Sequence, residues 1–312
     1  MSDTERLAPN DEGIARAAEL LRGGALVAVP TETVYGLAAR ADSEDAVAAI
    51  FRAKGRPDFN PLIVHVASLA MAHRLGELDG RAELLAERFW PGPLTLVVPA
   101  RANSPVVPAV TAGLPTVALR MPDHPATRAL LDAVALPLAS PSANPSGTVS
   151  PTAPEHVEAG LRGRIAAVLD GGPCPRGVES TIVALRVGDA WQLLRPGPIS
   201  EDELAGLLGP PTAVAGGRVE APGQLARHYS PGKPMRLVAT GAEEDEFLIG
   251  FGPVKGDCSL SEDGDLALAA ARLYACLHAA AASPRRRIAV SPIPDDGIGA
   301  AINDRLRRAA AE

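Results

Sequence analysis

The chain has 312 residues, of which 46% are hydrophobic, so it can bury a substantial core, and its length favours two domains. Its 30 lysines and arginines are outnumbered by 37 aspartates and glutamates, and the formal net charge of −7 argues against a broad surface for duplex nucleic acid. Aromatic residues make up only 3% of the chain, which favours a loop-rich α/β enzyme over a protein that stacks bases.

Neither a leader peptide nor a membrane span is expected. The opening residues, MSDTERLAPNDE, are polar and acidic, and no run approaches the roughly 18 apolar residues that a bilayer-spanning helix requires. We therefore expect a cytoplasmic protein without a membrane partner. The three cysteines, Cys174, Cys258 and Cys276, are odd in number and lack C-x-x-C spacing, so we expect ordinary apolar residues rather than a disulfide framework or a zinc site.

Helix and strand signals alternate from the start of the chain. Residues 12–22 place apolar side chains on one helical face, and Gly23 supplies a stop. Asp42 or Ser43 can cap a second helix that runs to about Ala53. Apolar runs indicate strands at 25–29, 62–67, 94–98, 116–120, 137–140, 166–170, 180–185 and 191–195.

The order of these elements favours an α/β fold with a twisted mixed sheet and flanking helices. Some predicted strands follow each other directly, whereas helices separate others, and a purely parallel sheet would not show this order. No G-x-G-x-x-G follows the first strand, and no G-x-x-x-x-G-K-[ST] occurs in the chain. Neither a dinucleotide fold nor a P-loop is therefore indicated.

The composition changes after Gly209. Residues 210–234 are dense in proline and glycine, as in an interdomain linker, but their number and the sequence RHYS suggest a functional segment. A second, smaller α/β unit is predicted to follow. Its expected elements are strands at 235–240 and 287–290 and helices at 265–282 and 298–311. The predicted division is residues 10–209, 210–234 and 235–312.

Polar residues gather after the predicted strands, where an α/β sheet usually binds its ligands. The stretch PTETVYGL offers two hydroxyls and the Glu32 carboxylate, although T-x-T alone is more typical of a turn cap. The loop KGRPDFNPL carries Lys54 and Arg56, which suit phosphate oxygens, although K-G-R-P alone is more typical of a solvated helix end. His65 lies in an apolar strand and, taken alone, reads as a core histidine.

Two later stretches offer further ligands. PLASPSANPSGTVSPT forms a hydroxyl-rich loop that can bind phosphate or ribose, with a plain low-complexity loop as the alternative. Ser180 in GVEST lacks both the G-x-S-x-G context and a readable Asp–His partnership, so hydrolase chemistry is not favoured. Arg120 stands at a strand end, and in a cleft it would bind a carboxylate or a phosphate.

Taken together and in order, these motifs resemble the Sua5/YciO/YrdC family, and within it the two-domain Sua5 type. The resemblance covers roughly residues 13–308 and rests on PTETVYGL, KGRP…NPLIVH, FWPGPLT, LRMPDHP, SPSANPSGTVSPT, DGGPC…GVESTIV, LRPG and PG…HYSP. It implies a twisted α/β catalytic domain with a positive cavity, followed by a linker and a smaller C-terminal domain.

The resemblance also implies an activity. Family members join L-threonine, bicarbonate and ATP into L-threonylcarbamoyladenylate and release diphosphate. Downstream tRNA threonylcarbamoyltransferase proteins then pass the group to adenosine-37 of certain tRNAs. This chemistry needs positioning and charge neutralisation more than a protein nucleophile.

The family's site residues carry over to matching positions of this sequence. By resemblance, the residues that would hold L-threonine are Thr33, His65, Arg120, Ser140 and Ser180. Those that would hold ATP are Lys54, Arg56, Asn60, Thr116, Ser142, Asn144, Ser150 and Arg195. Lys54 and Arg56 would stabilise charge at the phosphates, and Mg²⁺ is expected to be carried by ATP rather than by a protein cage.

The linker is expected to cover the active site, with His228 and Tyr229 closing over the nucleotide and excluding water from a labile adenylate. Two alternatives stay open. One is a double-stranded-RNA-binding module, against which the net charge and sparse aromatics weigh, so that direct RNA binding is expected to be weak. The other is a carbamoyl-adenylate-forming enzyme that acts on a different substrate.

Overall fold

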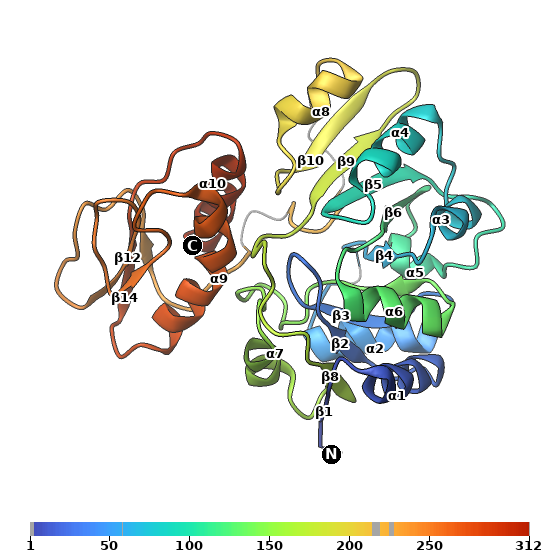
Figure 1. Cartoon of the computed structure of the whole chain (residues 1–312), viewed down its shortest axis with the longest axis horizontal. Helices are drawn as coiled ribbons and strands as arrows, with labels where there is room; N and C mark the ends of the chain where they lie inside the picture. The colour runs from blue at the N-terminus through green and yellow to red at the C-terminus, as the bar shows by residue number, and fades with distance from the viewer. Residues whose placement is uncertain (1–2, 58, 214–218, 225–227, 312) are drawn as a thin grey trace.

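The computed structural model describes residues 3–57, 59–213, 219–224 and 228–311, which form a larger and a smaller α/β unit side by side (Figure 1). The strands of the larger unit are β1 (Glu5–Leu7), β2 (Val27–Val29), β3 (Gly36–Arg40), β4 (Ile63–His65), β5 (Leu94–Pro99), β6 (Thr116–Arg120), β7 (Leu138–Ala139), β8 (Ala167–Leu169), β9 (Thr181–Leu185) and β10 (Trp191–Arg195). They form one ten-stranded sheet in the order β1-β8-β2-β3-β7-β4-β6-β5-β9-β10.

The sheet contains both parallel and antiparallel pairs, which confirms the predicted mixed α/β fold. β2 pairs with β3 antiparallel, whereas β4 pairs with β6 parallel. The second pairing aligns His65 with Arg120, and β7 lies on the other side of β4. The strand ends that carry the predicted polar residues are therefore neighbours in space.

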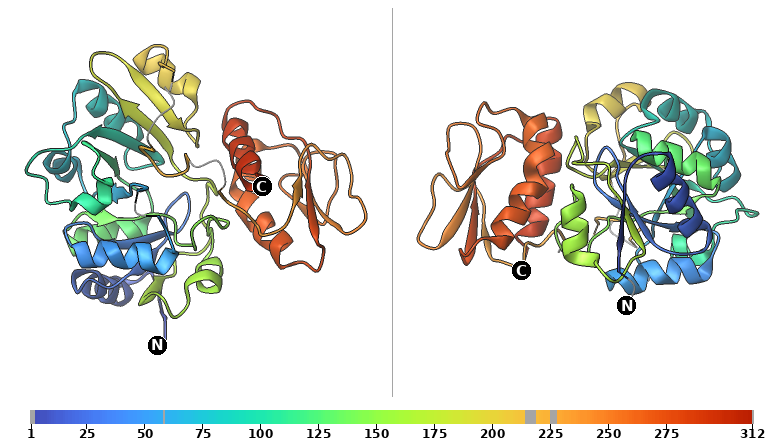
Figure 2. Two further views of the ribbon diagram at one scale, coloured as in Figure 1. Left: turned by 180° about the vertical axis from the view of Figure 1, so that it is seen from behind. Right: turned by 60° about the horizontal axis from the view of Figure 1, so that its bottom comes forward.

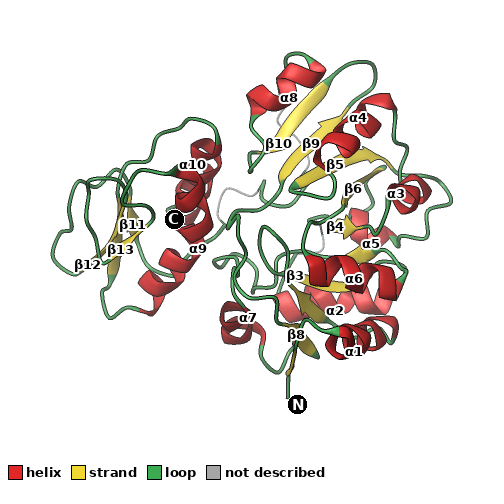
Figure 3. Ribbon diagram, viewed as in Figure 1, coloured by secondary structure: helices red, strands yellow, loops and turns green. Residues whose placement is uncertain are grey.

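Helices cover the faces of the sheet (Figure 3). The helices of the larger unit are α1 (Asp11–Arg22), α2 (Glu44–Lys54), α3 (Leu69–Leu75), α4 (Gly80–Phe89), α5 (Pro108–Thr111), α6 (Pro125–Val134), α7 (Pro154–Leu161) and α8 (Glu201–Leu208). Ser43, rather than Asp42, caps α2, because its side chain accepts a hydrogen bond from the Ala46 amide. Gly55 ends α2 with φ 61°, a left-handed conformation that favours glycine.

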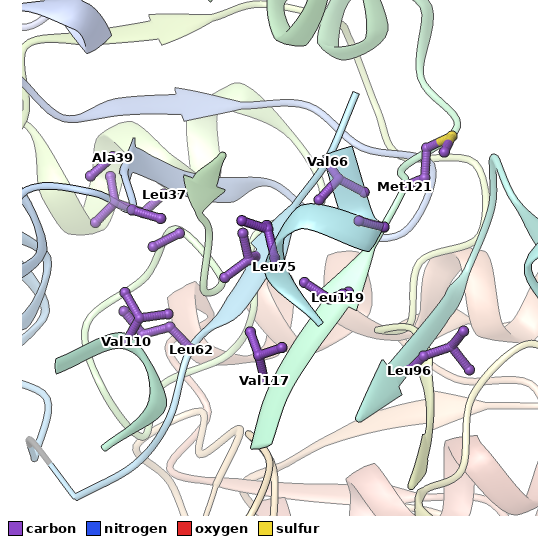
Figure 4. Packing of buried hydrophobic residues seen from close by; sticks show 14 of the residues in the cluster. Leu37, Ala39, Leu62, Val66, Leu75, Leu96, Val110, Val117, Leu119 and Met121 are labelled. Atoms are coloured by element: carbon purple, nitrogen blue, oxygen red, sulfur yellow. The ribbon is translucent and has the colours of Figure 1, made fainter. Parts of the chain in front are cut away.

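Aliphatic side chains from the sheet and its covering helices form the main core (Figure 4). Leu37 of β3 and Leu119 of β6 face Leu75 of α3, and all three are almost completely buried. Leu62 and Val117 extend the same cluster. Because the strands that carry the polar loops are anchored in this core, the loops start from fixed positions.

The smaller unit is a four-stranded parallel sheet with two helices. Its elements are β11 (Met235–Arg236), β12 (Glu246–Gly250), β13 (Cys258–Ser259), α9 (Leu266–Ala282), β14 (Arg287–Val290) and α10 (Ile298–Ala309), and the strand order is β11-β14-β12-β13. The strand predicted at 235–240 has only two residues, because Val238 adopts φ 58° and leaves the extended region. β12 was not predicted.

The two helices of the smaller unit face the larger unit, and its sheet lies on the outside (Figures 1 and 2). One hydrophobic cluster spans the boundary: Val34 and Val178 of the larger unit pack with Leu273 and Leu306 of the smaller one. Tyr229, from the segment between the units, belongs to the same cluster. The smaller unit is therefore packed directly behind the loops that carry predicted site residues.

The expectation of unpaired cysteines is wrong for two of the three. Cys258 of β13 and Cys276 of α9 form a disulfide, whereas Cys174 is free and buried. The pair is 18 residues apart, and the packing of α9 against β13 brings the Cα atoms to 6.0 Å. Sequence spacing carries no signal for this tertiary contact. Across the described ranges, no group of three potential metal-ligating side chains occurs, and no helix is long and apolar enough to cross a membrane.

Candidate functional site

A small cavity of about 40 Å³ lies where the larger unit, the interdomain segment and the loop after β7 meet. Its lining includes many of the side chains singled out in the sequence. The predicted site residues on its wall are Arg56, His65, Arg120, Ser140, Ser142, Arg195, His228 and Tyr229. Thr31, Glu179, Pro222 and Gly223 also line it. The other predicted site residues stand behind this wall or away from it.

Arg120, which lines the cavity, belongs to a buried ion pair with Glu32. Arg120, at the end of β6, donates from Nη2 to Glu32 Oε1 at 2.6 Å and from Nε to the Gly92 carbonyl at 3.3 Å. The second Glu32 oxygen accepts from the Asp123 amide at 2.9 Å. Both side chains of the pair are about 5% exposed. The guanidinium is therefore fixed in orientation before any ligand arrives.

His65 and Ser140 lie beside this pair with polar atoms facing inward. Burial, and next the positive charge of Arg120, hold the pKa of His65 well below its usual range, so the ring is neutral. Among the described residues, His65 Nδ1 and Ser140 Oγ have no hydrogen-bond partner. A Cβ at Gly36 would collide with Ser140 Oγ, so this hydroxyl needs glycine opposite it.

The side chains of Lys54 and Arg56 are buried although Gly55 between them is exposed, so these two cations do not form a solvated helix end. Arg56 is 8% exposed and donates to its own loop, from Nη2 to the Pro61 carbonyl at 3.0 Å and to the Asn60 carbonyl at 3.3 Å. Burial, and next the charge of Arg195, lower the pKa of Arg56 to about 10. The side chain remains a cation at neutral pH and faces the cavity.

Lys54 acts here as a clamp on the hydroxyl-rich loop rather than as part of the cavity wall. Its ammonium donates to the carbonyls of Ser142 at 2.5 Å and Asn144 at 2.6 Å. Asn144 in turn donates to the Thr148 carbonyl at 2.9 Å. Burial, and next Arg56, lower the pKa of Lys54 well below its usual range. Its predicted contact with phosphate stays a prediction.

Arg195 also lines the cavity, and Ser180 holds its guanidinium. Arg195 donates from Nε to the Ser180 carbonyl at 3.1 Å and from Nη2 to Ser180 Oγ at 3.1 Å. Ser180 Oγ also lies 2.8 Å from Thr95 Oγ1. The hydroxyl is thus tied to an arginine and a threonine, with no histidine base among these partners, which agrees with the weak case for a serine hydrolase.

The turn after β2 and the start of β6 place two predicted residues differently. Thr33 is fully buried, and its hydroxyl lies 2.9 Å from Thr31 Oγ1, which itself donates to the Val34 carbonyl. Thr31 is therefore the turn cap, as T-x-T suggests. Thr116 stands at the opposite end of β6 from Arg120 and lines a separate cavity near Arg101. The structure does not bring Thr116 to the site, and its predicted role at ATP stays a prediction.

The described part of the interdomain segment closes one side of the cavity. Tyr229 is 1% exposed, and the His228 ring packs edge-on against it with centroids 4.1 Å apart. Burial lowers the pKa of His228 to about 3. The Ser230 amide donates to the Gly147 carbonyl at 2.8 Å, which ties this segment to the hydroxyl-rich loop. Residues 214–218 and 225–227 of the predicted linker lie outside the described residues.

Sequence reasoning assigned no role to Glu179, Tyr274 or Arg305. Ser150, predicted to hold ATP, donates instead to Glu179 Oε1 at 2.6 Å. Tyr274 of α9 and Arg305 of α10 donate to the same carboxylate. The sequence did offer a signal for Glu179, because it is an acidic residue inside the GVEST motif and the other motifs contribute several cations that it could pair with. No comparable signal marks Arg305, which reads as one of several arginines on an amphipathic helix.

The arrangement suits a multiply charged anionic ligand. Three arginines face a space with hydroxyls, and each of the two carboxylates in the same region is already paired with an arginine. Buried guanidinium groups are favourable partners for carboxylate and phosphate oxygens. Asn60 and Asn144 each keep a buried side-chain oxygen without a partner among the described residues. These oxygens stand behind the cavity wall.

Each of the two units matches a model of a known protein family. A family model described as "Telomere recombination" (Sua5_yciO_yrdC) matches residues 19–197. A second model, described as "Threonylcarbamoyl-AMP synthase, C-terminal domain" (Sua5_C), matches residues 199–311. Together they span most of the described chain.

Relatives match over nearly the whole length. A protein from Bacillus subtilis named threonylcarbamoyl-AMP synthase is 41% identical over 98% of this chain and 95% of its own. One of the same name from Pyrococcus abyssi is 40% identical over 94% of this chain and 93% of its own. The crystal structure of P. abyssi Sua5 complexed with L-threonine superposes with a TM-score of 0.90, at 35% identity, over 99% of this chain and 98% of that one.

Proposed function

The chain belongs to the Sua5/YciO/YrdC family and carries that family's Sua5 C-terminal domain, and on this basis we propose that it is a threonylcarbamoyl-AMP synthase. The reaction joins L-threonine, bicarbonate and ATP into L-threonylcarbamoyladenylate and releases diphosphate. The observation that carries the proposal is the small cavity walled by Arg56, Arg120 and Arg195, because ATP and bicarbonate are anions at neutral pH and threonine carries a carboxylate. The likeness to a Sua5 structure complexed with L-threonine supports the choice of amino acid.

L-Threonine binds on the side of the cavity formed by β4 and β6. Arg120 pairs with its carboxylate, and the bonds of Arg120 to Glu32 and Gly92 fix the plane of the guanidinium in advance. Neutral His65 and the unpartnered Ser140 hydroxyl offer hydrogen bonds to the amine or the side-chain hydroxyl. Thr33 and Ser180 complete the set that resemblance predicts.

ATP binds on the opposite side. Arg56 and Arg195 face the triphosphate, and the loop that contains Ser142 and Asn144 lies along the ribose or the phosphates. The Lys54 clamp holds the carbonyls of this loop and so positions its amides and hydroxyls. Asn60, Thr116 and Ser150 stay assigned to ATP by resemblance alone.

The residues promote the reaction by orientation and charge rather than by covalent attack. The threonine amine combines with bicarbonate to form a carbamate and water. A carbamate oxygen then attacks the α-phosphorus of ATP, the bond to the β-phosphate oxygen breaks, and diphosphate leaves with the bonding electrons. Fixed arginines on both sides of the cavity neutralise the charges of attacking and leaving groups and hold them in line.

Mg²⁺ is expected to accompany ATP. The carboxylates nearest the cavity, Glu32 and Glu179, are engaged by Arg120 and Arg305. A protein cage built from them would have to break a buried ion pair, which is costly. The donor set therefore fits a cation held mainly by phosphate oxygens and water, and the cation would add charge neutralisation at the triphosphate.

The interdomain segment acts as a lid. A cavity of about 40 Å³ is far below the hundreds of Å³ that small-molecule sites usually offer, so the wall must move to admit nucleotide. Most of that wall belongs to the larger unit, whereas Pro222, Gly223, His228 and Tyr229 belong to the segment. Opening of this segment admits substrates, and closure excludes water from the adenylate.

The product serves tRNA threonylcarbamoyltransferase proteins, which act downstream, and we place the enzyme in the cytoplasm with them. The family match and the Sua5 C-terminal domain favour this function over a double-stranded-RNA-binding module. The bound L-threonine in the P. abyssi Sua5 structure favours it over a carbamoyl-adenylate-forming enzyme for another substrate.

Diphosphate release separates these functions. The assay measures ATP consumption and diphosphate formation with threonine, bicarbonate or both omitted. We expect release to require both. Release that is indifferent to threonine points to another substrate, and the absence of release together with tight binding of double-stranded RNA points to the binding module.

A further inference from the structure

Glu179 is a cavity-lining carboxylate whose partners come largely from the smaller unit. Its oxygens accept from Ser150 Oγ at 2.6 Å, from the Tyr274 hydroxyl at 2.8 and 3.0 Å, and from Arg305 Nε at 3.0 Å. Tyr274 belongs to α9 and Arg305 to α10. Both helices of the smaller unit therefore reach the wall of the proposed active site.

Arg305 is held firmly in this position. Its side chain is 0% exposed, and Nη1 donates to the Pro196 carbonyl at 2.7 Å and to Asp304 at 3.0 Å. Its guanidinium carbon lies 5.6 Å from the centroid of the Tyr229 ring, within the range of a cation–π interaction. A guanidinium buried so completely needs a countercharge, and Glu179 and Asp304 both supply it.

Glu179 also stands close to the cations that face the ligand. Burial opposes ionisation of Glu179, but attraction by Arg305, and next by Arg195, lowers its pKa to about 2. The carboxylate is therefore charged at neutral pH. Arg195 donates hydrogen bonds to Ser180 and to the Pro222 carbonyl rather than to Glu179. Of the two arginines that attract the Glu179 carboxylate, only Arg195 would remain if Arg305 were lost.

We propose that Arg305 is a positioning residue for the nucleotide side of the site. By holding the Glu179 carboxylate, it keeps Arg195 available for anionic ligand oxygens and keeps Ser150 in its orientation. The identity of the ligand as a nucleotide rests on the proposed function. The proposal gives the smaller unit a defined task, because α10 supplies the charge that sets the electrostatics of the cavity.

The test compares Arg305→Met with wild type in the full chain. Binding of an ATP analogue with a methylene bridge between the α- and β-phosphorus is measured by calorimetry, and the KM values for ATP and threonine are measured by diphosphate release. Loss of one charge-assisted contact to nucleotide predicts an ATP dissociation constant and KM about tenfold higher. The KM for threonine should change by less than about threefold, because Arg120 and Glu32 are untouched.

Arg307→Met is the matched control, since this arginine is exposed on the same helix and its loss removes the same charge. It should leave both KM values at the wild-type level. Arg305→Lys, which keeps the charge, should recover much of the ATP affinity. Equal rises in the two KM values, or unchanged analogue binding in a destabilised Arg305→Met, would mean that Arg305 is only structural.

A double variant keeps the proposal testable if Arg305→Met fails to fold. Because Arg305 is proposed to act through Glu179, Glu179→Gln/Arg305→Met should bind the analogue as tightly as Glu179→Gln alone. A double variant that binds about tenfold more weakly than Glu179→Gln overturns the proposal. Analogue binding also separates the two ideas: a wild type that binds the analogue but shows no threonine-dependent diphosphate release contradicts only the proposed function. A wild type that binds no nucleotide contradicts both.

Discussion

Arg120 and Glu179 both line the cavity and each belongs to a buried ion pair, but the two pairs differ in where their partners come from. Arg120 and Glu32 both belong to the larger unit, 88 positions apart, and meet at 2.6 Å. Arg305 and Glu179 join the two units across 126 positions and meet at 3.0 Å. The first pair orients a guanidinium toward the ligand, whereas the second engages a carboxylate that would otherwise compete with the ligand. If the proposed sites are right, the threonine side is internal to one unit, whereas the nucleotide side depends on docking of the other.

The largest effect is expected at Arg120. Arg120→Ala removes the proposed partner of the threonine carboxylate and leaves Glu32 buried without its countercharge. Breaking a buried pair typically costs about 3–5 kcal/mol of stability. We expect kcat/KM for threonine to fall at least about a hundredfold, as for loss of a charge-assisted bond to substrate. Arg120→Lys should recover stability better than activity, because an ammonium lacks the planar fork.

Thermal unfolding measures the loss of stability, and the threonine dependence of diphosphate release measures the loss of activity. Arg101→Ala, at an exposed arginine, is the control for a general change of charge. If the threonine KM of Arg120→Ala equals that of wild type, Arg120 does not bind the amino acid, and the role proposed for the Arg120–Glu32 pair is wrong.

A smaller effect is expected at Arg56, which belongs to the nucleotide side. Arg56→Ala should raise the KM for ATP about tenfold and lower turnover, because it removes one charge-assisted contact to phosphate. The KM for threonine should stay near its wild-type value. Arg52→Ala is the matched control, since Arg52 lies four residues before Arg56, in the last turn of α2, and is exposed. An ATP dependence that is the same in Arg56→Ala and wild type contradicts the assignment.

The interdomain segment joins the two sides, and its replacement tests the lid. A Gly/Ser linker in place of residues 222–231 removes His228 and Tyr229 from the cavity wall. We expect slower turnover by severalfold and a lower yield of intact adenylate per diphosphate released, because water reaches the product. Chromatography of the adenylate alongside a diphosphate assay measures this ratio. If rate and yield both match wild type, the segment is not a lid.

The smallest effects concern the pH dependence of stability. They test the contacts between the two units, at Glu179 and at the His156–His278 stack. The pKa of Glu179 falls from an ordinary 4.5 to about 2 in the folded chain, so its contribution is present above pH 4.5 and is lost as pH falls toward 2. His156 of α7 stacks on His278 of α9 with centroids 3.8 Å apart. Burial, and next the charge of His278, lower the pKa of His156 from 6.5 to about 4. The stability that depends on a neutral His156 is therefore present above pH 6.5 and is lost as pH falls from 6.5 to 4.

Thermal unfolding across this pH range should therefore show two separate windows. Glu179→Gln should flatten the profile below pH 4.5, and His156→Gln should flatten it between pH 6.5 and 4. A profile that is unaltered by Glu179→Gln would mean that the carboxylate is not the group whose charge holds the units together.

The sequence predicted the fold best where the signal is local. Apolar runs predicted β5, β6 and β9 to within about a residue, because buried inner strands read as continuous hydrophobic segments. The run at 191–195 also matched β10, which is the edge strand. The strand predicted at 235–240 fails because Val238 takes a left-handed conformation, for which the sequence offers no glycine or asparagine signal. The Cys258–Cys276 disulfide was missed because only the packing of α9 on β13 brings the cysteines together.

The candidate site shows the same limit. Arg56, Arg120 and Arg195 were recognised through motifs and all line the cavity. The Glu32 carboxylate was noted, but its pairing with Arg120 was not, and Glu179 and Arg305 were not singled out, because all three act through contacts between distant parts of the chain. Lys54 has the residue type that suits phosphate, but the structure uses its charge on two carbonyls. Motifs therefore indicate which charges matter, and packing decides what each charge meets.

The most direct test of the central claim follows the carbon of isotopically labelled bicarbonate into product. The wild-type chain is incubated with labelled bicarbonate, ATP and threonine, and the adenylate is identified by mass spectrometry. We predict that the label appears in L-threonylcarbamoyladenylate in a one-to-one ratio with diphosphate, and that Arg120→Ala abolishes both. Diphosphate release without labelled adenylate, or labelled adenylate formed without threonine, would contradict the account.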